Sequence, residues 1–429
     1  MCKKSLLPLL LVLPLLLSCG NPPRRAEAVR EERHIPELIA AVPSDALAVI
    51  CHDHCSEGMR LLDSANVLHR LDLSEFKNAR MALSLCFNGS LVPVLALDAG
   101  RAEADSASAI NGLLEQAAAL KLQAEYIHPD LEAKRRGFVL ITPSDAQLTA
   151  VRRHLTEYSS ILDAPGFRQA LLAADSENFL IFRGGGAPER LAPKGWMQGI
   201  FPRRELTAFL GSVADWTVLI PETGGFSVKP VCGGEGDSFF ANILGTLPFG
   251  DSRLGEILPQ EVRFALALPV SLPKLREAVE RWQDATVKLT RYKGRLDELR
   301  KASGKNPLNW EKEVGVQEIA LVHFDGGAVV LVRPAKPAAD SEPADNPLRG
   351  FLPALYGNAF ALDDDSCTAC AFGWQVYGSP GAVGAFLAAE RPEKPADWPG
   401  RGCRFLIHQP GKTLAWGKKG IKLTWNSNQ

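Results

Sequence analysis

The chain has 429 residues, of which 46% are hydrophobic and 23% are charged, a composition that allows a large globular core and more than one structural unit. The formal net charge is −1, so the chain lacks the excess of Lys and Arg with which proteins bind nucleic acid. Beyond the first twenty residues no apolar run reaches the about 20 residues that a membrane-spanning helix needs, which predicts a soluble body.

The N-terminus is organised like an export signal. The basic residues Lys3 and Lys4 precede an apolar run from Leu6 to Leu17, and the small residue Ser18 follows that run. The run is too short to cross a bilayer. We therefore expect residues 1–18 to be a signal peptide and not a permanent membrane helix.

The end of this leader, Leu16-Leu17-Ser18-Cys19, resembles the lipobox of bacterial lipoproteins. The resemblance implies cleavage before Cys19, fatty acylation of the Cys19 thiol with chains such as palmitate, and acylation of the new amino terminus. Several acyl chains on one residue give a stable membrane anchor. Gly20, not Asp, follows the cysteine, which favours the outer membrane of a Gram-negative bacterium. The alternative is ordinary secretory cleavage, in which Cys19 has no role.

Residues 19–35 follow the leader and are polar, charged and contain proline. The only prolines of this segment are Pro22 and Pro23, and it has too few apolar residues to form a core of its own. It predicts a tether that holds the folded body up to ~50 Å from the bilayer.

The remaining chain alternates strand-like and helix-like patterns, which predicts an α+β fold of mainly antiparallel sheet covered by helices. In the first half the strands are expected at 45–52, 80–87, 91–97, 138–142, 178–183, 217–220 and 226–231. Helices are expected at 56–73, 105–124, 145–155, 166–174 and 204–213.

The second half repeats the order of the first. A strand, a helix, a hairpin, a strand that runs into a Pro-bearing helix start, a further strand and a final hairpin recur in that sequence. This predicts an internal duplication, with one unit at 36–245 and a related unit at 246–429. The matched segments are 46–51 with 262–268, 81–83 with 319–321, 138–141 with 374–377, 143–146 with 379–382, and 179–181 with 405–407.

One predicted helix, at 272–302, is much longer than its counterpart in the first half. It carries an apolar stripe at helical spacing, which indicates core packing. Its length also leaves room for a partner-binding end. The Pro-, Ala- and Asp-rich segment 333–347 predicts a surface loop.

Several of these motifs occur together in a known group of proteins. Ala41-Val42-Pro43-Ser44-Asp45 opens the body, Pro143-Ser144-Asp145 ends a strand, and the segment 163–171 reads DAPGFRQAL. Over residues 36–429 this order resembles an exported bacterial family of unknown function. The resemblance supports the fold and an envelope location, and it supplies no catalytic residues.

The sharpest polar cluster is Cys51-His52-Asp53-His54-Cys55. Thiolate and imidazole are the ligands that zinc prefers, so Cys51, His52, His54 and Cys55 are candidate metal ligands. If the preceding strand continued, Cys51, Asp53 and Cys55 would face one way. Two alternatives remain open: a disulfide, or a strand end with Cys51 buried and both His in solvent.

A second cysteine pair, Cys367 and Cys370, forms a CxxC motif. Such a pair can be a disulfide, half of a metal site or a redox centre, although the preceding acidic residues would raise the thiol pKa. Once Cys2 and Cys19 are set aside, seven of the nine cysteines remain, an odd number that leaves at least one unpaired. Cys86 and Cys403 lie in strand-like runs, as buried free cysteines often do.

Taken together, these patterns predict a lipid-anchored protein of the cell envelope that binds or scaffolds an envelope protein or glycan, without a cofactor. A metal- or thiol-dependent enzyme that uses Cys51/Cys55 or Cys367/Cys370 is one alternative, and a carrier of an apolar ligand is another.

Overall fold

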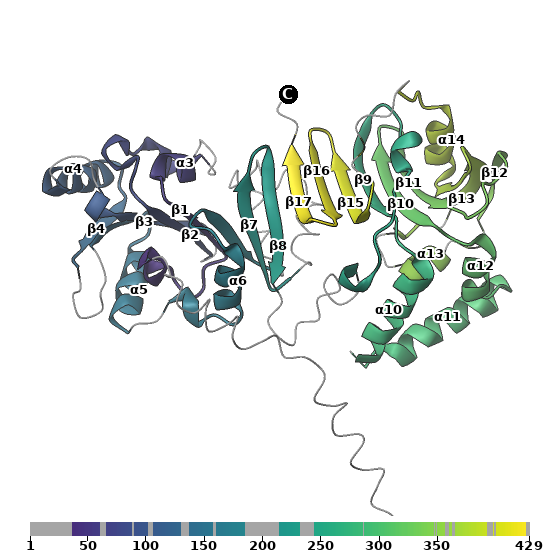
Figure 1. Cartoon of the computed structure of the whole chain (residues 1–429), viewed down its shortest axis with the longest axis horizontal. Helices are drawn as coiled ribbons and strands as arrows, with labels where there is room; N and C mark the ends of the chain where they lie inside the picture. Colours follow the sequence, from purple (N-terminus) through teal and green to yellow (C-terminus); the bar gives the residue numbers. More distant parts are fainter. Residues whose placement is uncertain are drawn as a thin grey trace, which may run out of the picture.

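The computed structural model describes residues 37–425 except 61–65, 88–89, 102–105, 130–136, 158–159, 185–213, 232–243, 286, 347, 349, 357–359, 363–364, 393–397 and 399. In this part of the chain the fold is α+β, with seventeen antiparallel strands in one sheet and nine α-helices (Figure 1). None of the described helices is long and apolar enough to cross a membrane.

Eight strands come from the first half of the chain and nine from the second. The first eight are β1 (Ala48–His52), β2 (Met81–Phe87), β3 (Leu91–Asp98), β4 (Gln123–Ile127), β5 (Phe138–Thr142), β6 (Phe179–Arg183), β7 (Trp216–Glu222) and β8 (Gly225–Val231). The others are β9 (Val262–Leu268), β10 (Glu318–Phe324), β11 (Gly327–Arg333), β12 (Ser341–Asp345), β13 (Cys367–Ala371), β14 (Trp374–Gly378), β15 (Cys403–Gln409), β16 (Lys412–Gly417) and β17 (Gly420–Trp425).

The strand pairings define a single row. From one edge to the other the order is β4-β5-β3-β2-β1-β6-β7-β8-β17-β16-β15-β9-β10-β11-β14-β13-β12. The last hairpin of each half meets the other at the pairing of β8 with β17, which we call the seam. There Val228 lies opposite Ile421, and Phe226 lies opposite Leu423.

The two sides of the seam have the same arrangement. Counted outward, one side runs β8-β7-β6-β1-β2-β3-β5, and the other runs β17-β16-β15-β9-β10-β11-β14. Because all the strand pairings are antiparallel and helices cover the sheet, the prediction of an antiparallel α+β fold is confirmed. The sheets of the two halves form one continuous sheet. The unit boundary near residue 245 stays a prediction.

Most strands are apolar on both faces because helices cover both sides of the sheet. On β1, Ala48 and Ile50 belong to one buried cluster, whereas Val49 and Cys51 belong to another on the opposite face. The first cluster runs across the seam and joins both halves; two separate clusters, one in each half, lie on the other face.

The nine helices of the described chain are divided between these faces. Buried residues of α3 (Cys55–Met59), α4 (Ser106–Ala119), α10 (Leu272–Ala285), α11 (Leu289–Ser303), α12 (Pro307–Val314) and α13 (Phe351–Tyr356) join the shared cluster. On the other face α5 (Asp145–Thr156) and α6 (Phe167–Ala174) cover the first half, and α14 (Pro380–Ala388) covers the second.

Two of the helix starts that the sequence predicts have the expected caps. The Ser144 side chain accepts a hydrogen bond from the Gln147 N–H at the start of α5, and the Ser379 side chain accepts one from the Ala382 N–H at the start of α14. Each satisfies a backbone donor that the first helical turn leaves unpaired.

One free edge of the sheet is protected by its composition. Strand β12, at one edge, reads Ser-Glu-Pro-Ala-Asp, and all five residues are exposed. A proline and two acids discourage pairing with another chain. The sequence predicted a loop at this position, and the structure shows that an edge strand tolerates the same residues.

Three other elements differ from the prediction. The helix expected at 272–302 is two helices, α10 and α11, because the backbone of Val287 is left-handed, with φ 59°. The helix expected at 105–124 ends at Ala119, and residues 123 and 124 belong to the strand β4. In the segment 56–73 the described residues, which exclude 61–65, form α3 and a short 3₁₀ turn in place of a continuous helix, and the helix expected at 204–213 lies outside the described residues.

Candidate functional site

The last hairpin of the chain leaves one of its faces open. On β16 and β17, Leu414, Ile421 and Leu423 are buried in the core shared by both halves. The alternate residues point to the opposite face of the sheet. There Thr413 lies opposite Thr424, and Ala415 lies opposite Lys422.

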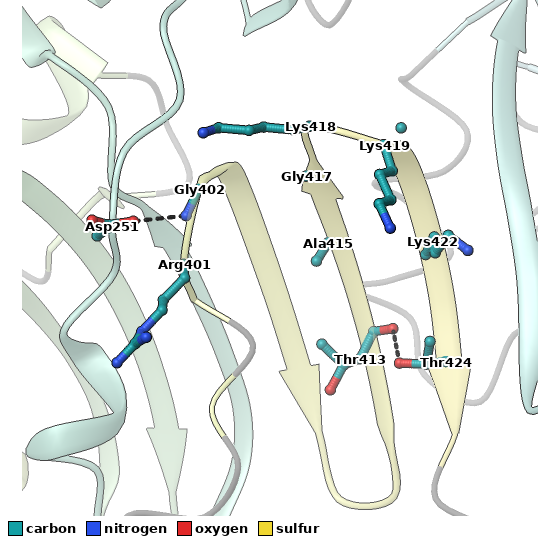
Figure 2. A pocket seen from close by; sticks show the side chains of 11 residues that line it. Asp251, Arg401, Gly402, Thr413, Ala415, Gly417, Lys418, Lys419, Lys422 and Thr424 are labelled. Atoms are coloured by element: carbon teal, nitrogen blue, oxygen red, sulfur yellow. Dashed lines mark hydrogen bonds between the residues drawn. The ribbon is translucent and has the colours of Figure 1, made fainter.

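This open face forms the floor of a pocket of about 540 Å³, which we call the seam groove (Figure 2). Thr413, Ala415, Gly417 and Thr424 give this floor mostly small side chains. The residues that line it are Asp251, Arg401, Gly402, Thr413, Ala415, Gly417, Lys418, Lys419, Gly420, Lys422 and Thr424.

Four cations and one acid of the described residues lie around this floor. Lys418 and Lys419 are exposed in the turn between β16 and β17, and Arg401 is exposed on the preceding segment. The Lys422 ammonium is 2.6 Å from the Glu222 carboxylate across the seam. The exposed lysines at the turn are therefore the charges that the fold presents most directly to a ligand.

The acid of the groove already has a backbone partner. The Asp251 carboxylate accepts a hydrogen bond of 2.7 Å from the Gly402 N–H (Figure 2). Gly402 has φ 59°, and a Cβ at this position would lie 3.5 Å from the Lys418 Cε. The aliphatic stem of Lys418 thus lies over a glycine whose left-handed backbone disfavours other residues.

A buried carboxylate fixes the loop that carries Asp251. The Glu318 carboxylate accepts hydrogen bonds from the Ser252 hydroxyl at 2.5 Å, the Arg253 N–H at 3.0 Å and the Arg333 Nε at 3.1 Å. Burial raises the pKa of Glu318, and these three donors oppose that rise. Because all three donors converge on one buried group, the rim of the groove is held in place.

The Cys51–Cys55 cluster does not form a single-faced site. Strand β1 ends at His52, and α3 begins at Cys55. Cys51 is buried on one face of the sheet and Cys55 on the other. Because the strand does not continue to residue 55, the condition for a shared face of Cys51, Asp53 and Cys55 is not met.

The two histidines of the cluster interact with their neighbours. His52 Nδ1 accepts the His54 N–H at 3.0 Å and lies 3.1 Å from an Asp53 carboxylate oxygen. Burial, more than any other cause, lowers the pKa of His52, which favours its neutral form. Within the described residues no group of three or more His, Cys, Asp and Glu side chains is placed to hold a metal ion. Metal binding at Cys51, His52, His54 and Cys55 stays a prediction.

The CxxC motif lies within strand β13, not at the start of a helix. Residues three apart on a strand point to opposite faces and have Cα atoms about 10 Å apart, beyond the reach of a disulfide. Cys367 is buried, Cys370 is half-buried, and both are free thiols. A disulfide between Cys367 and Cys370 is therefore incompatible with this backbone, and a redox role stays a prediction.

The other described cysteines, Cys51, Cys55, Cys86 and Cys403, are also free and buried. This confirms Cys86 and Cys403 as buried free cysteines. Burial raises the pKa of Cys55, Cys86 and Cys403 to about 12, so their reactive thiolate forms are rare at neutral pH. Cys19, the predicted lipidation site, lies outside the described residues.

No family model matches this chain, and neither a curated protein nor a solved structure matches it. The resemblances to bacterial lipoproteins and to an exported family stay predictions.

The seam groove was not singled out from the sequence, although a signal was present. The segment from Lys412 to Thr424 alternates polar or small residues with apolar ones on both of its strands. Such alternation indicates a sheet with one open face. What the alternation does not indicate is which other segments border that face.

Proposed function

We propose that this chain is a lipid-anchored protein of the cell envelope that binds an acidic segment of another envelope polypeptide in the seam groove. The observation that carries the binding proposal is the charge around the groove. Arg401, Lys418 and Lys419 outnumber Asp251 there, while Lys422 is paired with Glu222, in a chain whose formal net charge is −1. The leader and Cys19 support the anchor.

The chemistry of the floor favours a polypeptide over a glycan or a base. Among the described residues that line the groove there is no aromatic side chain, so they offer no ring on which a sugar or a base could stack. Thr413 and Thr424 supply hydroxyl groups, and the Thr424 hydroxyl donates to the Thr413 carbonyl at 3.3 Å. Lysines act as point charges and suit carboxylates presented at varied angles.

We also propose that the two halves arose by duplication of one α+β unit. Support comes from the matching strand order on the two sides of the seam and from the sequence segments that recur in the same order. In this view the paired final hairpins made the seam, and the open face of β16 and β17 became the binding surface of the joined protein.

The binding proposal is tested with the full-length protein and a fluorescent hexaglutamate peptide, by fluorescence anisotropy at low salt. Lys418→Gln/Lys419→Gln removes two exposed cations. Because exposed charge pairs contribute about 0.2–1 kcal/mol each, we expect about tenfold weaker binding. Raising the salt concentration should weaken binding by the wild type further.

The matched control is Arg60→Gln/Lys121→Gln, which removes the same charge from exposed positions far from the groove. It should bind hexaglutamate as the wild type does. An equal loss of affinity in both variants would mean that only the net charge matters, and would overturn the proposal that the peptide binds in the groove. If an anionic oligosaccharide bound more tightly than the peptide, the proposed polypeptide ligand would be wrong and a glycan would take its place. Mass spectrometry of Cys19 tests the anchor separately.

A further inference from the structure

A second basic surface lies away from the seam groove. It comprises Val287, in the turn between α10 and α11, and the segment 288–305, which contains α11. We call this surface the basic hairpin, with the turn at Val287 as its tip. Figure 1 shows α10 and α11 below the second half of the sheet, with α4 at the opposite end of the molecule. Leu296 is the buried residue of α11, and most of the other described side chains of this helix face outward.

The charge of the basic hairpin is opposite in sign to that of the rest of the chain. Residues 288–305 have a net charge of +5, from seven cations and two acids, whereas the whole chain has −1, which leaves −6 for all other residues. The cations are Lys288, Arg291, Lys293, Arg295, Arg300, Lys301 and Lys305, and the acids are Asp297 and Glu298.

Most of this charge is not neutralised within the described fold. Arg300 pairs with Asp297 at 3.3 Å. Arg291, Lys293, Arg295 and Lys301 are exposed, and none of them has an ion pair with any residue that the structure describes. A solvent-facing helix with so few internal pairs is typical of one that meets an anionic surface.

The tip of the hairpin is apolar. Val287 is 92% exposed, the largest exposure among the large apolar side chains described as exposed. Its φ of 59° is rare for a β-branched residue and costs free energy. The fold thus holds an apolar side chain in water, in a strained conformation, directly before a run of cations.

We infer that the basic hairpin docks on an anionic phospholipid bilayer, with α11 on the headgroups and Val287 at the interface. Cations beside an exposed apolar residue are the combination that peripheral proteins use at membranes. A nucleic acid or an acidic protein would use the charge but not the valine tip. This surface is separate from the groove, and the inference does not depend on the proposed acidic peptide.

The test uses the full-length protein with Val287→p-benzoylphenylalanine, mixed with vesicles of phosphatidylcholine alone or with 30% phosphatidylglycerol, and measures photo-crosslinking to lipid. We expect strong crosslinking in the anionic vesicles and a background level in the neutral ones. Lys121→p-benzoylphenylalanine, in the turn that follows α4, should give background in both.

A charge variant then separates docking from anchoring. Each basic residue near an anionic surface contributes about 1 kcal/mol, or about fivefold. Arg291→Gln/Arg295→Gln should therefore lower the affinity of the hairpin for anionic vesicles about 25-fold and bring crosslinking at position 287 to the neutral-vesicle level. Arg60→Gln/Lys121→Gln should leave it unchanged.

Equal crosslinking at position 287 in both kinds of vesicle, or none in either, would overturn the inference. So would retention of the signal in Arg291→Gln/Arg295→Gln. A protein that is anchored only through its acyl chains would give one of these results. Failure of the hairpin to dock can therefore be distinguished from failure of the Cys19 anchor.

Discussion

His408 on β15 links the core to the seam groove at the level of a single residue. Its Nδ1 lies 3.1 Å from the hydroxyl of Thr413, which lines the groove. Its ring and that of Trp398 pack edge to face, with 5.5 Å between the ring centroids. Burial lowers the pKa of His408, so the folded protein favours the neutral imidazole.

This predicts a pH dependence of stability with a definite sign. An unfolded His has a pKa of about 6.5, above that of folded His408, so the unfolded chain binds more protons as the pH falls through this range. The stabilisation is therefore present above pH ~6.5 and declines toward pH 5. His408→Asn removes this titration while keeping a polar group near Thr413.

Urea unfolding at pH 7.5, 6.5 and 5.5 measures the effect. We expect the free energy of unfolding to fall with pH in the wild type and to fall less in His408→Asn. Burial also lowers the pKa of His52, so His52 accounts for part of the pH dependence of the free energy of unfolding that remains in His408→Asn. The control His69→Asn changes an exposed histidine and should keep the wild-type slope. Identical slopes in all three proteins would show that His408 is not the group responsible.

At the scale of elements, the seam depends on a glycine. Gly225 begins β8 and lies opposite Thr424 of β17. A Cβ at position 225 would overlap the Leu423 carbonyl oxygen and lie 3.0 Å from the Thr424 Cα. Both are backbone atoms of the partner strand, so a side chain at 225 cannot be accommodated without moving β17 away from β8.

We therefore expect Gly225→Ala to lower the free energy of unfolding by about 3 kcal/mol, at the upper end of the usual cost of overpacking. The neighbouring Gly224 is the control, because it has φ 74° and a Cβ there would have no atom of the described chain within 4 Å. Gly224→Ala should cost only the about 1 kcal/mol of a left-handed alanine. Urea unfolding of both variants measures the difference, and equal costs would contradict close packing at the seam.

The break between α10 and α11 shows what an apolar stripe leaves undecided. The stripe runs through residues 272–302 without interruption, and it predicted one helix. In the structure the Lys288 N–H donates to the Gln283 carbonyl and the Val287 N–H to the Asp284 carbonyl, which ends α10. The chain then turns so that Leu296 reaches the core under α13. Packing against α13 thus outweighs the local preference for one continuous helix.

At the scale of the whole molecule, one core runs through both halves. The cluster that contains Ile50 also contains Phe226, Leu423 and Ile319, so it crosses the seam. Separation of the halves would expose this apolar surface to water at a cost of about 25 cal/mol per Å². Two halves that share a core are expected to lose their structure together.

Differential scanning calorimetry of the wild type should therefore show one unfolding transition whose van't Hoff and calorimetric enthalpies agree. In Gly225→Ala, where the seam is weakened, the transition should broaden or divide. Two separate transitions in the wild type would mean that the halves are independent and that the seam contributes little to stability.

The sequence alone determined what depends on near neighbours. Most strand positions, the capping serines 144 and 379 and the final hairpin follow from patterns within about twenty residues, and the anchor proposed at Cys19 rests on a pattern of the same length. Such patterns depend on backbone propensity, capping and alternation, which act locally and can be read without a partner segment.

Tertiary structure decided what depends on contacts between distant segments. The ion pair of Lys422 with Glu222 joins residues 200 positions apart, and the seam pairs strands from the two halves of the chain. The groove likewise needs Asp251 and Arg401 beside the β16–β17 hairpin, and the faces taken by Cys51 and Cys55 follow from where β1 ends. Alternation along a strand shows that one face is open, but the strand that pairs with it is selected by burial of apolar area over the whole chain.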